Sequence, residues 1–110
     1  MIRDTIDKLE AELAEANALQ PERRAELLEL LASLRDEVNE LAASDGERAR
    51  SIATFTEASA HEATRKTRDQ ELFDLSLKGL SRSVEELKSS HPRLAQVVGR
   101  LCNVLSNLGI

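Results

Sequence analysis

The sequence predicts an all-α protein: a helical hairpin followed by further amphipathic helices, which form a bundle completed by oligomerisation. Helix-forming residues dominate, and with only two aromatic side chains, Phe55 and Phe73, aliphatic residues must build the interior. Apolar residues recur in alternating steps of four and three, the spacing of one helix face. The 110 residues form a single domain, 1–110. Two prolines and a few turn signals divide it into helical segments joined by short connections. We expect helices at roughly 2–18, 21–43, 47–66, 69–89 and 92–108.

The first two segments predict the hairpin. The first carries a narrow apolar stripe, typical of the seam between two helices of a coiled coil. The second begins at Pro21, because proline is favoured at a first helical position, and Leu28 and Leu30 widen its stripe on both sides. The candidate core or interface residues of the hairpin are Ile6, Leu9, Leu13, Leu27, Leu31, Leu34, Val38 and Leu41.

Turn signals bound the middle of the chain. Asp45-Gly46 predicts a turn or helix end, and Ser44 with Glu47 three residues later fits a capping box for the next helix. Thr67 with Gln70 fits a second capping box. These signals predict a separate helix between the hairpin and the fourth segment.

The segment at 47–66 is helical by composition but poor in large apolar residues. Its best face holds Ile52 and Phe55 among small side chains. Small residues either let a neighbouring helix approach closely or leave the most mobile helix of the fold, and we favour the mobile helix. One continuous helix over 47–89 is the competing prediction.

The last two segments complete the predicted bundle. The fourth ends where Pro92 restricts the residue before it, and Ser90 is the candidate N-cap of the last helix. At 100° per residue, the apolar residues of the last helix span about 160°. An arc this wide needs two or more covering neighbours, which predicts that the last helix is central. The candidate core or interface residues here are Phe73, Leu77, Leu80, Val84, Leu87, Leu94, Val98, Leu101, Leu105 and Leu108.

The net charge of −5 is unevenly distributed. Residues 1–46 carry 5 basic and 12 acidic side chains, whereas residues 47–110 carry 10 and 8. We therefore expect the acidic first half to lie near the basic last helix, within one chain or between two. After Glu86 the basic side chains are few and spread along the sequence, whereas a nucleic-acid interface needs a clustered basic face. No nucleic-acid partner is expected.

The start of the chain and its single cysteine indicate a cytoplasmic protein. Cys102 is the only cysteine, so a disulfide within one chain is excluded. Met1 is followed directly by a charged amphipathic segment, and long apolar runs are absent from the sequence. We expect a soluble protein with no membrane partner.

Residue types that carry chemistry do not converge in the sequence. "HEATR" at 61–65 lacks the second histidine of a zinc helix, so His61 is expected to be exposed. His91 is expected to help close a turn, and Cys102 to be a half-buried small apolar residue. The carboxylate clusters are expected to be solvated, and we expect no catalytic, cofactor-binding or metal-binding residue. Gly79 and Gly99 mark either a close approach by another chain or tolerated surface positions.

The end of the sequence, "SSHPRLAQVVGRLCNVLSNLGI" at 89–110, resembles the C terminus of a family of short bacterial proteins described only as a domain of unknown function. The resemblance covers 70–110 best and 1–45 loosely. It implies a fold of a few helices and a bacterial origin, and it brings no activity, cofactor or site. The positions that carry it are His91, Pro92, Arg93, Leu94, Leu108, Gly109 and Ile110.

Three functional hypotheses follow. The first is a non-enzymatic helical scaffold or interaction module that forms a homo-oligomer, most simply a dimer, because the arcs of the second and fifth segments exceed what one neighbour covers. The second is an adaptor or regulator whose first two segments dock on a helix of another protein. The third, an enzyme or small-ligand binder, is favoured least. The expected partner is the protein itself or another helical protein, with no cofactor.

Overall fold

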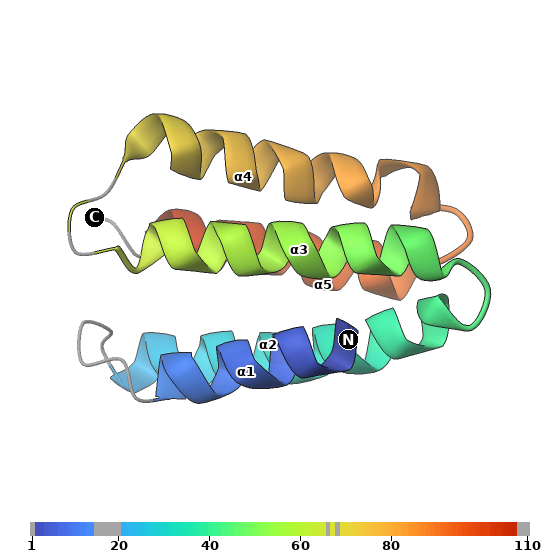
Figure 1. The fold of residues 1–110 in the computed structure, drawn as a ribbon, viewed down its shortest axis with the longest axis horizontal. Coiled ribbons are helices and arrows are strands. Elements are labelled where there is room, and N and C mark those ends of the chain that lie inside the picture. Colours follow the sequence, from blue (N-terminus) through green and yellow to red (C-terminus); the bar gives the residue numbers. More distant parts are fainter. Residues whose placement is uncertain (1, 15–20, 66, 68, 108–110) are drawn as a thin grey trace.

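The computed structural model describes residues 2–14, 21–65, 67 and 69–107, and every regular element in this part of the chain is a helix (Figure 1). The α-helices are α1 (Ile2–Ala14), α2 (Pro21–Ala42), α3 (Gly46–Ala63), α4 (Gln70–Ser83) and α5 (Pro92–Asn107), and η1 (Glu85–Leu87) is a short 3₁₀ helix. The predicted all-α class is confirmed, while oligomerisation stays a prediction. None of the described helices combines the length and the apolar character that crossing a membrane requires.

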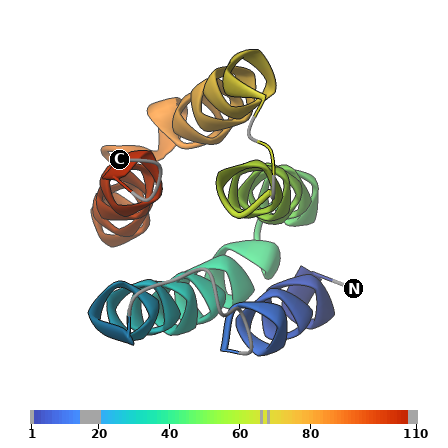
Figure 2. The same ribbon diagram turned by 90° about the vertical axis from the view of Figure 1, so that its left-hand side faces the viewer.

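All five α-helices contribute buried side chains to one core, and α1 packs against α2 and α3 (Figure 2). Seen end-on, α3 lies between α4 and the α1–α2 hairpin, and α5 closes the bundle between α2 and α4. The molecule measures 37 × 25 × 21 Å. Helix α4 therefore forms the edge of the bundle farthest from the hairpin.

The core is aliphatic, with Phe73 as its largest side chain among the described residues. Of the core or interface candidates, Leu77 is half-buried against the core. The side chain of Leu13 and all of Leu108 lie outside the part of the chain that is described. The other candidates are buried: Ile6, Leu9, Leu27, Leu31, Leu34, Val38, Leu41, Phe73, Leu80, Val84, Leu87, Leu94, Val98, Leu101 and Leu105.

The central helix is α3, and the prediction that the last helix is central is wrong. Helix α3 packs against all four other α-helices. Ala49, Ala53, Ser59 and Ala60 are buried on it, and such small side chains let neighbouring helices approach closely. The sequence favoured the most mobile helix here, on the expectation of weak burial. The expected weak burial is wrong, while the mobility itself stays a prediction. Close approach by neighbours, the alternative left open, is what the structure shows.

The wide apolar arc of α5 is covered within the chain. Helices α2, α3 and α4 and the η1 turn all contact it. Leu94, Val98, Leu101 and Leu105 are at most 1% exposed. Val97 and Cys102 are half-buried against the core, so the described part of the arc is covered mainly by the chain itself.

The start of α3 differs from the predicted capping box. The side chain of Asp45 accepts a hydrogen bond from the backbone N–H of Arg48 (3.0 Å), so Asp45 is the N-cap. Ser44 instead donates to the carbonyl of Leu41 (3.2 Å). A carboxylate suits this position because it accepts from a free N–H and complements the positive end of the helix. Gly46 begins the helix itself and does not adopt a positive φ.

The break between α3 and α4 excludes one continuous helix over 47–89. Helix α3 ends at Ala63, where the hydroxyl of Thr64 donates to the carbonyl of Ala60 (2.8 Å). The N-cap of α4 is Asp69, whose carboxylate accepts from the N–H of Leu72 (3.2 Å), and not Thr67 as predicted. The charged acceptor next to the helix again takes precedence over the hydroxyl.

Helix α4 ends at Ser83, well before the predicted boundary. The hydroxyl of Ser83 donates to the carbonyl of Leu80 (2.6 Å), a local hydrogen bond that competes with continuation of the helix. The chain tightens into the η1 turn, where the N–H of Leu87 donates to the carbonyl of Val84 (2.9 Å). Leu87 stays buried, so the turn still contributes to the core.

Candidate functional site

Helices α3 and α4 lie side by side (Figure 1), and each carries large apolar side chains that remain exposed. Leu75 is 63% exposed, Leu72 is 44% exposed and Phe55 is 37% exposed. Leu72 and Leu75, three residues apart, are neighbours on the surface of α4, and Phe55 reaches α4 at Gly79. We call these four residues the α3–α4 patch.

Helix α4 carries two apolar stripes. The core stripe contains Phe73, Leu77 and Leu80. At 100° per residue, Leu72 lies about 110° from the middle of that stripe and Leu75 about 170° from it. The second stripe therefore cannot reach the core from the same helix, and it remains at the surface.

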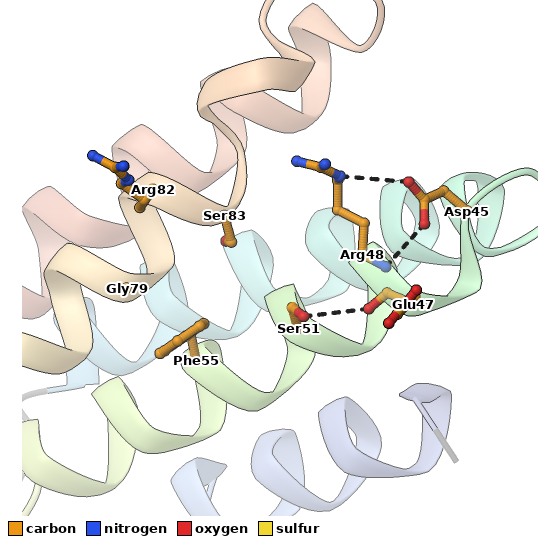
Figure 3. Close-up of a pocket in the computed structure, with 8 residues that line it drawn as sticks. All are labelled: Asp45, Glu47, Arg48, Ser51, Phe55, Gly79, Arg82 and Ser83. Carbon is orange, nitrogen blue, oxygen red and sulfur yellow. Dashed lines mark hydrogen bonds and ion pairs between the residues drawn. The ribbon is translucent and has the colours of Figure 1, made fainter.

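Phe55 lies across Gly79 (Figure 3). A Cβ atom at position 79 would overlap the Phe55 ring, so this packing requires glycine. The close approach at Gly79 comes from the same chain, which answers a question that the sequence left open. At Gly99 a Cβ atom would meet nothing within 4 Å, so Gly99 is a tolerated surface glycine.

A surface groove of about 460 Å³ adjoins the α3–α4 patch and continues toward the start of α3 and the end of α4 (Figure 3). Phe55 and Gly79 supply its apolar end, and charged and hydroxyl side chains supply the rest. Its lining residues are Asp45, Glu47, Arg48, Ser51, Phe55, Gly79, Arg82 and Ser83.

Some of the charged side chains that line this groove form ion pairs and others do not. Arg48 forms ion pairs with Asp45 (3.4 Å) and with Glu86 (3.0 Å), which ties the start of α3 to the η1 turn. Glu47 and Arg82 are both exposed, and neither forms an ion pair with another described residue. One charge of each sign is therefore available to a partner beside the exposed apolar side chains.

The charges along α4 are divided between its two halves. Glu71 and Asp74 lie in the N-terminal half, and Lys78 and Arg82 lie in the C-terminal half. All four side chains are exposed. The division complements the helix dipole, and it also gives the outer surface of α4 a direction.

The histidines and the cysteine occupy separate places. His61 is exposed. His91 closes the turn before α5: its N–H donates to the carbonyl of Leu87 (2.7 Å), and its Nδ1 lies 3.0 Å from the hydroxyl of Ser90. Ser90 was predicted to be the N-cap of α5, but His91 lies between Ser90 and the first helical residue, so this prediction is wrong. Cys102 is half-buried, and burial raises the pKa of its thiol, which disfavours the nucleophilic thiolate.

The carboxylates of the hairpin serve an ion-pair network. The guanidinium of Arg35 on α2 lies 3.2 Å from both Asp7 and Glu10 on α1. The hydrogen bond with Asp7, followed by the charge of Glu10, raises the pKa of Arg35. Within the described ranges, no three acidic, histidine or cysteine side chains gather closely enough to hold a metal ion.

A second hollow, of about 350 Å³, lies between α2 and α5. Asp36 and Glu37 line it from α2, and Arg93 and Arg100 line it from α5. The acidic first half and the basic last helix thus lie close together within one chain, one of the two arrangements that the charge distribution predicts.

The α3–α4 patch was not identified from the sequence. Leu72 and Leu75 lie off the core stripe of their segment, and Phe55 was expected on the best-buried face of its own. The signal was a second stripe, Leu72, Leu75 and Gly79, which repeats the spacing of a helix seam. Whether this second stripe is buried or exposed depends on which face of α4 the fold leaves uncovered.

The chain matches one protein family over residues 29–110, and that family is described as a domain of unknown function, DUF4404. Because the match spans most of the chain, the protein belongs to this family. An uncharacterised family was predicted from the sequence, and this is confirmed, whereas a bacterial origin stays a prediction. Neither a curated protein nor a solved structure matches the chain. The family match includes all of the α3–α4 patch and leaves α1 outside.

Proposed function

We propose that this member of a family of unknown function is a non-enzymatic helical protein that acts by association, first of all with a second copy of itself. The α3–α4 patch carries the proposal, because Leu72, Leu75 and Phe55 are large, apolar and exposed on two helices that pack side by side. Covering such side chains removes apolar area from water, which is favourable. A single exposed leucine would need no such explanation.

The support for association differs from what the sequence alone suggested. The apolar arcs of the second and last helices are covered within the chain, as the burial of Leu31 and Leu101 shows. The surface that stays uncovered is on α4, at the edge of the bundle (Figure 2). Self-association through α4 would not require the bundle itself to open.

Sedimentation equilibrium over a range of protein concentrations tests this function. We expect the mean mass to rise from that of one chain, 12.2 kDa, toward twice that value. A mass of one chain at every concentration contradicts self-association. That outcome would favour the heteromeric adaptor. Because the described apolar stripes of α1 and α2 are buried within the chain, the partner helix would meet the exposed patch and not the hairpin as first predicted.

A further inference from the structure

We infer that the α3–α4 patch is a two-fold symmetric dimer seam, in which α4 of one chain lies antiparallel to α4 of a second copy. The inference rests on the proposed self-association and adds the surface, the partner and the orientation.

The spacing along α4 is that of a helix–helix seam. Leu72, Leu75, Ser76 and Gly79 follow one another at intervals of three, one and three residues and cover about 10 Å at 1.5 Å per residue. Small residues allow a facing helix to approach, while large ones fill the space between helices. If the two-fold axis passes between Leu75 and Ser76, Leu72 of one copy faces Gly79 of the other, beside Phe55.

Charge complementarity identifies the occupant as a second copy in an antiparallel orientation. In that orientation Glu71 of each chain, beside the stripe, lies near Lys78 and Arg82 of the other, and the symmetry forms this contact twice. In a parallel orientation like charges would meet, which is unfavourable. Glu71, Lys78 and Arg82 form no ion pair within the described part of the chain, so their charges are available.

The place of α4 in the fold allows this contact. Figures 1 and 2 show α4 along one edge of the bundle, with the α1–α2 hairpin on the opposite side. A second copy can therefore approach α4 without meeting the hairpin. Because a two-fold contact uses the same surface on both chains, association closes at the dimer.

Leu75→Arg tests the surface. Leu75 is 63% exposed, so the variant should fold, which circular dichroism and thermal melting check. An arginine on each side of the axis places like charges in the seam, and we expect the dimer Kd to weaken at least about tenfold. Asn103→Arg adds the same charge at an exposed position of α5 and should leave the Kd unchanged.

The outcomes separate the seam from the function it rests on. If the wild-type protein is monomeric, both the seam and the proposed self-association fail. If the wild-type protein dimerises and Leu75→Arg dimerises equally well, self-association stands and this surface is overturned.

A charge-reversed chain tests the orientation. The acidic and basic halves of α4 are exchanged in a chain that carries four substitutions, E71K, D74K, K78E and R82E. In an antiparallel seam this chain should still pair with itself, because its acidic half meets the basic half of its copy. It should not pair with the wild type, because the halves that face each other would then carry like charges. Native mass spectrometry of an isotope-labelled mixture should show heterodimers well below the random share. A random share, or an excess of heterodimers, would overturn the antiparallel orientation.

Discussion

Replacing Gly79 with alanine tests the contact between α3 and α4 that shapes the patch. Glycine inside a helix is less favourable than alanine by about 0.5–1 kcal/mol, so the replacement stabilises a helix where space is open. Gly99 of α5 is such a position, because an added Cβ atom meets nothing within 4 Å. Gly99→Ala should therefore raise the free energy of unfolding by about 0.5–1 kcal/mol.

At Gly79 the same methyl group overlaps the Phe55 ring. The ring must swing away and lose its packing, and overpacking of this kind costs about 1–3 kcal/mol. Gly79→Ala should therefore leave the free energy of unfolding unchanged or lower it by up to about 2.5 kcal/mol. In a Phe55→Ala background no ring remains, and the replacement should recover the gain of about 0.5–1 kcal/mol.

Urea unfolding followed by circular dichroism measures all four members of this cycle. We expect a coupling energy of about 1–3 kcal/mol between positions 55 and 79. The protein concentration is held constant, because association itself adds stability. If Gly79→Ala stabilises as much as Gly99→Ala, with or without Phe55, the ring does not lie across Gly79 and this reasoning is refuted.

Three further predictions concern the core, a cap and the thiol. Leu101→Ala should lower the free energy of unfolding by about 2–5 kcal/mol, because Leu101 is fully buried. Arg100→Ala, on the exposed side of α5, should change it little. If both variants lose the same free energy in denaturant unfolding, the buried face of α5 is misplaced. Asp69→Ala should lower the same free energy by about 0.5–2 kcal/mol and Thr67→Ala should not, and the reverse order would contradict the N-cap of α4. Burial raises the pKa of the Cys102 thiol above its ordinary 9.0, so its reaction with a thiol reagent should accelerate only at higher pH than that of an exposed cysteine. The protonated thiol's contribution to stability should be lost as the pH rises through the raised pKa. A reaction profile centred at or below 9.0 would contradict this prediction.

Local signals predict much of the fold. Proline acts on its own backbone and on the residue before it, and α2 and α5 begin at Pro21 and Pro92. The four-three spacing selects side chains on one helix face, and most of those chosen are buried. The all-α class follows from these two signals.

The order of helices in space could not be predicted in the same way. Small residues such as Ala53 and Ala60 are compatible with a poorly buried helix and with a closely packed one. Only the neighbours decide between them, and α3 has neighbours on several sides. The caps were misassigned for a similar reason, because two suitable residues lie close together and the path of the loop selects Asp45 and Asp69.

The candidate surface lay beyond sequence reasoning for a related reason. Leu72 and Leu75 form a short second stripe beside the longer core stripe of α4. Whether such a stripe is covered depends on where the fifth helix lies. Since α5 lies against α2 and the core side of α4, the second stripe stays exposed.

Methyl NMR spectra recorded as the protein is diluted test the central claim most directly, because they locate self-association without any substitution. Between about 1 mM and about 10 μM, a range that covers weak and moderate Kd values, the methyl resonances of Leu72 and Leu75 should shift. Those of Leu28, half-buried on α2, should stay in place. Shifts confined to α2 or α5, or no shift at any residue, would contradict association through the α3–α4 patch.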